Sequence, residues 1–282
     1  MDESNKERKT PVSKVLVKNG LEESIEKAVE LIGGMQNIIS PDEKILVIGN
    51  FNSSDRYPAS SDSRFLRALV RILQSHGTRN ITLGASCGLA WQPTREVLKK
   101  KKAYKLAEEL GIELINFDEG EWVKIDIKGN YFKSVSISET AVDADRVIYV
   151  PNAKTHSLAR FSMSLKFAVG LMEPQSRREL HNDHLEEKVV EVNLALRPDL
   201  IIMDARKCLV TGGPAKGRRK KAGFVLASKD QVAMDMEGLK ILKSFKAKNR
   251  LDMPLWELPQ MAAAQRLGIG ISGDDDYLVV EG

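Results

Sequence analysis

The 282-residue chain has few of the residues that often define a small secreted or metal-cluster protein: two cysteines, four histidines and 6% aromatic residues. Two cysteines, Cys87 and Cys208, are too few for a disulfide framework or a four-thiolate cluster, and they fit a reducing compartment. No apolar run approaches the length of about 18 residues that a membrane-spanning helix needs. The polar first ten residues lack the apolar core of a signal peptide. We therefore expect a cytoplasmic protein with no membrane partner.

A large excess of charge of one sign is also missing. The chain carries 43 Lys and Arg against 39 Asp and Glu, a net charge of +4 at pH 7. It shows no RNP, zinc-finger or helix-turn-helix pattern, so nucleic acid is not an expected partner. Hydrophobic content of 42% and charged content of 29% are ordinary for a soluble globular protein with a substantial core.

Short apolar runs alternate with longer amphipathic stretches along the chain. This alternation predicts an α/β fold with a mostly parallel β-sheet covered by helices on both faces, Rossmann-like in class. The predicted strands are 12–17, 44–48, 80–83, 111–117, 147–150, 200–203 and 224–227, with a hairpin over 121–136. The predicted helices are 21–32, 63–76, 92–110, 162–172, 185–196, 231–243 and 259–267. We expect residues 1–10 to form a disordered tail and 11–282 a single α/β module, with two lobes meeting near residue 150 as the alternative.

Three of the four histidines lie close together in the sequence, interleaved with two lysines. The first of these residues follow directly after the predicted strand 147–150, and α/β folds place their ligands at the carboxyl ends of strands. Lysine holds anions, or acts as a base when its pKa is lowered, and histidine transfers protons near neutral pH. The predicted catalytic residues are Lys154, His156, Lys166 and His181.

The same histidines also suggest a metal. His181 and His184 are three residues apart, so on a helix they would share a face, and imidazole suits zinc, nickel, iron or copper. The predicted metal ligands are His156, His181 and His184, which makes a divalent metal a candidate cofactor. The alternative is that these are ordinary polar residues at strand and helix ends.

Polar and glycine-rich residues follow other predicted strands. Gly212 and Gly213 permit close backbone approach to a ligand, and their N–H groups can form an anion nest. The basic tract 216–221 beside them could clamp a phosphate or carboxylate, or it is a solvated loop. Asp235 lies inside a predicted helix, where capping does not explain it. The predicted ligand-binding residues are Asn50, Asp55, Arg56, Thr155, Asp204, Gly212, Gly213 and Asp235.

Five segments carry a resemblance to the domain-of-unknown-function family 362 that covers nearly the whole chain: Val150–His156, Ser164–Lys166 with Gly170, Pro198–Ala205, Gly213–Pro214 with Gly217, and Ala227–Asp235. The resemblance implies the fold more than an activity. Many members carry ferredoxin-like cysteine clusters, which this chain lacks, so an iron–sulfur cluster is not expected. Members usually show Lys-Pro-Asn after the early strand, where this chain has Ile48-Gly49-Asn50.

The chain is also similar in overall plan to the lactate racemase family. That family holds a nickel pincer nucleotide on a lysine and uses histidines as metal ligand and acid/base. Its spacing of histidine, lysine and second histidine is matched here by His156, Lys166 and either His181 or His184. The family's second catalytic histidine is absent, because Gly84–Cys87 occupies that place.

Two functions fit these residues. The first is an enzyme that binds a small anionic substrate, a carboxylate or a phosphorylated compound, in a Lys- and His-lined cleft. The second is a non-catalytic module that carries a ligand, metal or cofactor in the same cleft. A homo-oligomer is compatible with the sequence. Nucleic-acid binding through 216–221 is the least favoured function.

Overall fold

The computed structural model describes residues 9–18, 20–88 and 92–282. Most of the expected tail, residues 1–8, therefore lies outside the described residues. The tail prediction is wrong at its end, because Thr10 already belongs to the first strand, β1 (Thr10–Leu16). No helix in the described ranges is long and apolar enough to cross a membrane.

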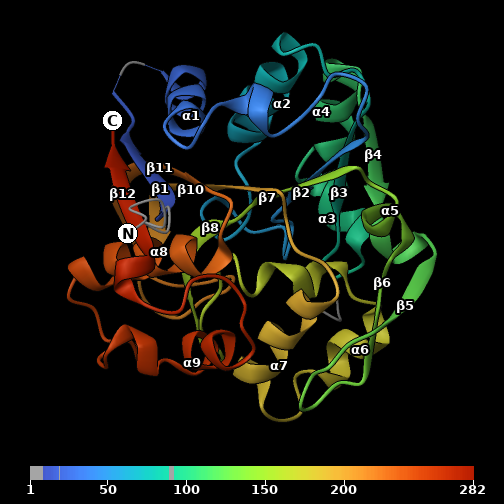
Figure 1. The fold of residues 1–282 in the computed structure, drawn as a ribbon. Coiled ribbons are helices and arrows are strands. Elements are labelled where there is room, and N and C mark those ends of the chain that lie inside the picture. The colour runs from blue at the N-terminus through green and yellow to red at the C-terminus, as the bar shows by residue number, and fades with distance from the viewer. Residues whose placement is uncertain (1–8, 19, 89–91) are drawn as a thin grey trace, which may run out of the picture.

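A ten-stranded sheet runs through the middle of the molecule (Figure 1). Eight strands follow the order β12-β1-β11-β10-β7-β2-β3-β4, and β8 pairs with β10 and with the short β9. The strands after β1 are β2 (Ile45–Gly49), β3 (Ile81–Ala85), β4 (Glu113–Asn116), β7 (Arg146–Val150), β8 (Asn152–His156), β9 (Arg160–Phe161), β10 (Leu200–Leu209), β11 (Arg219–Ser228) and β12 (Tyr277–Glu281). The predicted hairpin forms a separate pair of strands, β5 (Trp122–Asp126) and β6 (Ser134–Ser138).

The five strands from β10 to β4 are all parallel to one another. Along the chain, β2, β3 and β4 are added in one direction, and β7 and β10 are then added on the opposite side of β2. The connections leaving β2 and β7 therefore diverge at the carboxyl edge of the sheet. In open α/β sheets, the crevice at such a reversal of strand order is where ligands bind.

Helices cover both faces of the sheet, which confirms the predicted fold class (Figure 1). One face is covered by α1 (Leu21–Glu30), α2 (Ser63–Ser75) and α4 (Ala103–Leu110), and the other by α7 (Leu185–Glu191), α8 (Gln231–Ser244) and α9 (Pro259–Arg266). Asp62 and Asp230 begin α2 and α8 by accepting hydrogen bonds from backbone N–H groups of the first turn.

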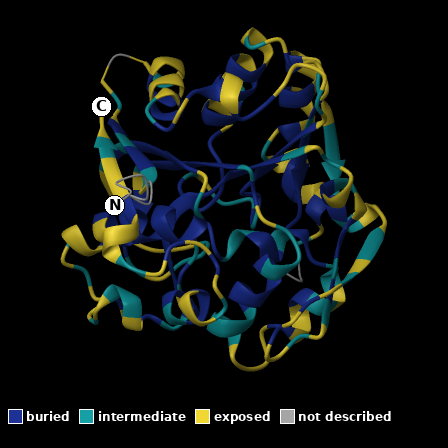
Figure 2. Ribbon diagram, in the orientation of Figure 1, coloured by how far each residue is buried: buried dark blue, intermediate teal, exposed yellow. Residues whose placement is uncertain are grey.

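Most residues of the central strands are buried, and they are dark blue in Figure 2. In β2, Ile45 and Val47 belong to the core under α1 and α2, whereas Leu46 and Ile48 belong to the core on the other face. This alternation follows from the two-residue period of a strand.

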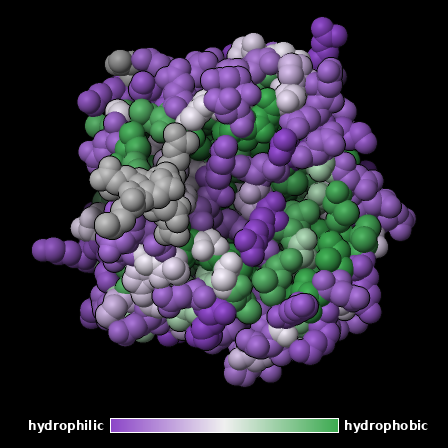
Figure 3. Space-filling view, viewed as in Figure 1, coloured by the Kyte–Doolittle hydropathy of each residue, from purple (hydrophilic) through white to green (hydrophobic). Residues whose placement is uncertain are grey.

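Figure 3 shows hydrophobic side chains gathered over the β5–β6 hairpin on the face in view.

Several predicted elements are wrong in detail. The predicted helix 92–110 is two helices, α3 (Thr94–Lys100) and α4, because Lys102 takes a left-handed conformation with φ 56°. The predicted helix 185–196 is shorter, since α7 passes into a 3₁₀ turn over Val192–Leu194. The predicted strand 200–203 continues through Asp204 to Leu209, so Asp204 lies within a strand and not at its end.

The predicted helix 162–172 is also wrong. The chain forms only a 3₁₀ turn there, over Phe167–Leu171. The Leu165 carbonyl, which would accept an i+4 hydrogen bond in a helix, accepts one from Asn193 Nδ2, and the Ser164 carbonyl accepts from Phe167 N and Gln231 Nε2. Lys154 and His156, which follow the predicted strand 147–150, themselves belong to a strand, β8.

Candidate functional site

A cavity of about 500 Å³ opens at the carboxyl edge of the sheet, where β2 and β7 diverge. The end of β2 contributes Asn50, and β8 contributes Lys154 and His156. The segment that follows β9 contributes Lys166 and His181. All four residues predicted to be catalytic therefore line one cavity.

Lys154 lies at the inner wall of the cavity, and only 2% of it is exposed. Its Nζ donates hydrogen bonds to the Ala59 carbonyl at 2.8 Å and to Asn50 Oδ1 at 3.3 Å. Asn50 is held in turn by its Nδ2, which donates to Asn152 Oδ1 at 2.9 Å. Burial, with a further contribution from Lys166, lowers the pKa of Lys154 to about 7.

Lys166 enters the cavity from the 3₁₀ turn that it precedes. Within the described residues, its ammonium group forms no hydrogen bond or ion pair. Burial lowers the pKa of Lys166 to about 8, because the charged form loses its hydration without gaining a partner. Two lysines thus line the cavity, and neither ammonium group is paired with a carboxylate. A bound anion would stabilise both charges.

His156 has its protonation state set by the backbone. Its Nδ1 accepts hydrogen bonds from the N–H groups of Leu158 at 3.2 Å and Ala159 at 3.1 Å. Nδ1 therefore carries no proton, and the neutral ring carries its proton on Nε2. Burial, and then the charges of Lys166 and Lys154, hold the pKa of His156 at about 2. His156 is a neutral hydrogen-bond donor over the whole physiological pH range.

His181 lies at the exposed rim and has the opposite arrangement. Its Nδ1 lies 2.6 Å from the Arg177 carbonyl, which can only accept, so Nδ1 carries the proton. The lone pair is then on Nε2, and the ring can accept a proton. Partial loss of hydration, followed by the charge of Lys166, lowers the pKa of His181, so the neutral form dominates at pH 7.

Two arginines, Arg177 and Arg178, also line the cavity, and Asp118 is its single lining carboxylate among the described residues. Arg177 is ion-paired with Asp118 and donates to Ser86 Oγ at 2.6 Å and to the Cys87 carbonyl at 3.0 Å. The ion pair with Arg177 neutralises the charge of Asp118. The remaining charge of the wall is positive.

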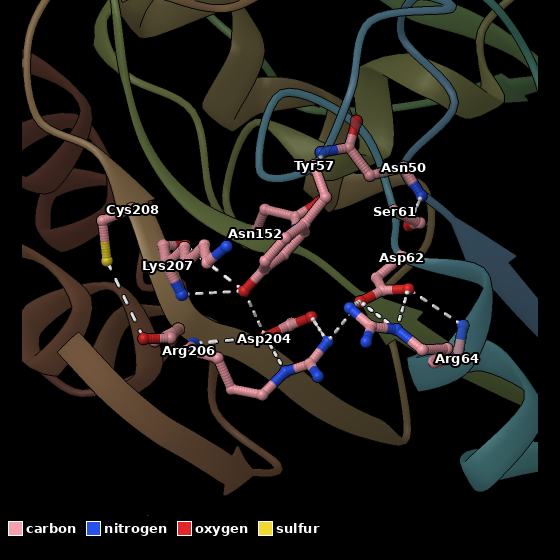
Figure 4. A network of polar contacts seen from close by, with 11 residues as sticks. Asn50, Tyr57, Ser61, Asp62, Arg64, Asn152, Asp204, Arg206, Lys207 and Cys208 are labelled. Atoms are coloured by element: carbon pink, nitrogen blue, oxygen red, sulfur yellow. Dashed lines mark hydrogen bonds and ion pairs between the residues drawn. The ribbon is translucent and has the colours of Figure 1, made fainter. Parts of the chain in front are cut away.

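Asp204 was expected to bind a ligand, but it does not line the cavity. It is 1% exposed and accepts hydrogen bonds from Tyr57 Oη at 2.7 Å and from Arg206 Nε at 2.9 Å. Figure 4 shows Arg206 reaching on to Asp62, so that the network joins β10 to the start of α2. The carboxylate of Asp204 is thereby used within the protein.

The predicted residues Asp55, Arg56 and Thr155 also do not line the cavity. Asp55 accepts a hydrogen bond from Ser53 Oγ at 2.8 Å, and Arg56 is exposed. Thr155 Oγ1 donates to the Leu209 carbonyl at 3.2 Å and so connects β8 to β10. Thr155 points away from the cavity because successive strand residues face opposite sides.

Gly212 and Gly213 do not line the cavity either. The next residue, Pro214, does. The N–H of Gly213 donates to the Lys216 carbonyl at 2.6 Å, and its carbonyl accepts from Ser157 N. The turn is closed on itself and docked on β8. It is not an anion nest facing the cavity.

Replacing Gly213 by alanine is expected to destabilise the fold by roughly 3 kcal/mol or more. An added Cβ would lie 1.8 Å from the Thr155 carbonyl oxygen, and the residue has a φ of +80°. Gly268→Ala is the matched control, because Gly268 has a φ of +63° but open space around it. Urea unfolding of both variants measures the difference, and equal losses would contradict this close approach.

His184, predicted as a metal ligand, lies outside the cavity lining. Its ring stacks on Tyr131 with centroids 4.6 Å apart. It does not share a helix face with His181, because α6 (Pro174–Glu179) ends before His181 and α7 begins after His184. Within the described residues, no three His, Cys, Asp or Glu side chains lie close enough together to hold a metal ion.

His156 does not fit the metal-ligand role either. A histidine that binds a metal through Nε2 needs its proton on Nδ1, directed at an acceptor. Here Nδ1 faces two N–H donors, so Nε2 is protonated and has no lone pair to offer. The residues present do not fit a metal bound through His156.

Sequence reasoning missed several residues of the site and its support. Arg177 can be identified as a site residue only from its contact with Asp118, which is 59 positions away in the sequence. Asn193 and Gln231 hold the backbone just before Lys166 and carry no local pattern that marks them. Asn152 could have been expected, because it lies in the Pro151–His156 segment that carried the prediction.

Comparisons with known proteins agree with this fold. The model of a family described as "Domain of unknown function (DUF362)" matches residues 45–240. A thylakoid-associated protein of Synechocystis sp. is 26% identical over 254 residues, which cover 87% of this chain and 74% of that protein. The lactate racemase apoprotein from Thermoanaerobacterium thermosaccharolyticum superposes with a TM-score of 0.51 at 14% identity, over 86% of this chain and 60% of that chain. The racemase likeness concerns the fold.

Proposed function

The chain belongs to the DUF362 family, and we propose that it is an enzyme that binds a small anionic substrate, a carboxylate or a phosphorylated compound, in the cavity at the carboxyl edge of a Rossmann-like sheet. The matched residues 45–240 include every basic side chain that lines the cavity. The observation that carries the proposal is the pair of buried Lys154 and partly buried Lys166, two ammonium groups that line one cavity, neither with a carboxylate partner.

The energetic reason is the cost of the unpaired charges. Both ammonium groups lose hydration, and the charge of Lys166 also repels that of Lys154, so the pKa of each is lowered well below the ordinary 10.5. An anion between them would replace the lost hydration with charge-assisted hydrogen bonds, each worth about 1.5–3 kcal/mol. A phosphate or carboxylate group fits this need, because its oxygens accept several hydrogen bonds at once.

The two histidines supply complementary chemistry. His156 presents an Nε2–H donor that can stabilise negative charge developing on the substrate, as a neutral imidazole does when its pKa is very low. His181 presents an Nε2 lone pair and can remove a proton from the substrate. A positioned general base contributes about 10²–10⁴ in rate. This pair suits proton abstraction next to a carbonyl or carboxylate group.

The proposal includes no metal and no step through one. The resemblance to lactate racemases implies a nickel cofactor held by a histidine, but His156 presents a protonated Nε2 to the cavity. A carrier module without catalysis is the alternative, and it would need the lysines but not the histidine pair. The relative from Synechocystis is named for its association with thylakoids, so a cytoplasmic location stays a prediction, as does a homo-oligomer.

Replacing Lys166 by methionine should weaken the binding of sulfate by about 10- to 100-fold, the loss expected for one charge-assisted hydrogen bond. Sulfate is the probe because its charge is constant between pH 6 and 9. The control is Lys100→Met, which removes one exposed charge on α3 outside the cavity. Isothermal titration calorimetry measures both affinities. Unchanged affinity in the Lys166 variant would contradict the proposal.

A further inference from the structure

We infer that Asp235, Gln231 and Asn193 are positioning residues, which fix Lys166 in the cavity by binding the backbone of the two residues before it. The inference rests on the proposed function, since it explains how that site holds its lysine. The three side chains come from α8 and from the turn after α7, far from Lys166 in the sequence. We call them the backbone cradle.

The cradle binds every main-chain polar group of Ser164 and Leu165. Asp235 accepts a hydrogen bond from Ser164 N at 2.7 Å through one carboxylate oxygen and from Leu165 N at 2.9 Å through the other. Gln231 Nε2 donates to the Ser164 carbonyl at 3.2 Å, and Asn193 Nδ2 donates to the Leu165 carbonyl at 2.8 Å. Gln231 also donates to Asn193 Oδ1 at 2.7 Å, which joins the cradle into one network.

The location of this backbone explains why a cradle is needed. Ser164 and Leu165 are fully buried, and they belong to no helix or strand. A buried backbone N–H or carbonyl group without a partner costs about as much as a lost hydrogen bond, and normally secondary structure provides the partner. Here side chains provide it. The chain can therefore pass through the core in an irregular conformation and direct the next residue, Lys166, into the cavity.

Close packing fixes the position of the cradle itself. A Cβ on Gly238 would lie 2.5 Å from Met163 Sδ, so the side chain of the residue before Ser164 packs directly against the backbone of α8. Asp235 lies one turn earlier on the same helix and is completely buried. The segment before Lys166 is therefore packed against the helix that carries Asp235 and Gln231.

Burying the carboxyl group of Asp235 costs free energy, so we infer that its two backbone contacts are needed. Asp235 forms no ion pair with any lysine or arginine in the described ranges, and burial raises its pKa to about 7 in spite of the two N–H donors. An unpaired buried carboxyl group does not increase stability in the way that an apolar side chain would. Its two oxygens, however, can bind two successive N–H groups.

The test is the pH profile of Lys166 acylation by an amine-reactive ester, followed by peptide mass spectrometry in the full chain. In the parent protein the midpoint for Lys166 should lie near 8. In Asp235→Asn, whose amide has only one acceptor oxygen, the backbone loosens and water reaches the ammonium group. The midpoint should then rise by about one pH unit or more, toward the ordinary value of an exposed lysine.

Asp230→Ala is the control, because it removes the N-cap of the same helix without touching Ser164 or Leu165. It should leave the Lys166 midpoint unchanged. Gln231→Met is a second cradle variant of similar size, which should raise the midpoint even if Asp235→Asn fails to fold. An unchanged midpoint in a folded cradle variant, or an equal shift in Asp230→Ala, would overturn the inference.

Sulfate affinity, measured on the same samples, separates this inference from the proposed function. A parent protein that binds no sulfate would contradict the anion site, while the acylation profiles would still decide the cradle. Binding in the parent with a loss of at least about fivefold in Asp235→Asn supports both. Full sulfate affinity in Asp235→Asn, with a normal Lys166 midpoint, would overturn the cradle alone.

Discussion

The affinity of the protein for sulfate is expected to fall by about a hundredfold or more between pH 6 and pH 9. In the free protein, Lys154 has a pKa of about 7 and Lys166 a pKa of about 8. Both lysines lose their protons within this range, whereas a bound anion favours the charged form of each. Sulfate therefore binds best to the protonated forms of both lysines, and the population of these forms falls as the pH rises.

Calorimetric titrations at several pH values measure this profile. Lys166→Met removes one of the two titrating lysines, so the variant should bind sulfate more weakly than the parent at pH 6. Between pH 6 and pH 9, the fall in its affinity should be about tenfold smaller than the fall in the parent. Lys100→Met should reproduce the full profile. A flat profile in the parent protein would mean that the two lysines do not hold the anion.

Replacing Asp204 by alanine is expected to destabilise the fold by about 3–5 kcal/mol, the range for breaking a buried ion pair by removing one partner. The change leaves the guanidinium of Arg206 and the hydroxyl of Tyr57 without their shared acceptor (Figure 4). Arg206 lies 5.3 Å from the centroid of the Tyr57 ring and 5.4 Å from that of Phe65, so its planar group cannot turn to water without disrupting both contacts.

Urea unfolding measures this loss, with Asp55→Ala as the control. Asp55 is less buried, and its side chain is held by the hydroxyl of Ser53. Its removal should cost less than about 1 kcal/mol. A loss below about 1 kcal/mol in Asp204→Ala would show that the network contributes little to stability.

The fold class and the main cavity residues could be predicted because the signals are local. A buried run such as 147–150 marks a parallel strand, and polar residues immediately after it are carried to the carboxyl edge of the sheet. Lys154 and His156 were selected in this way, and Lys166 and His181 were selected because histidines and lysines cluster in this part of the sequence; all four line the same cavity.

The remaining features depend on contacts between residues far apart in the sequence. The segment 162–172 has the composition of a helix, but the carbonyl groups of Ser164 and Leu165 accept hydrogen bonds from Gln231 and Asn193, which are 67 and 28 positions away. Asp204 follows an apolar run as a ligand residue would, yet Arg206 and Tyr57 use its carboxylate internally. The proton positions on His156 and His181 follow from backbone partners that no side-chain pattern reveals.

The most direct test of the anion site is the number of protons taken up when sulfate binds at pH 8. It is obtained from calorimetric titrations in two buffers with different ionisation enthalpies. At this pH, Lys154 is mostly neutral and Lys166 about half protonated in the free protein. Binding should therefore take up more than one proton per sulfate, and fewer in Lys166→Met. Binding without proton uptake would contradict the account, because the anion would then be held by groups other than Lys154 and Lys166.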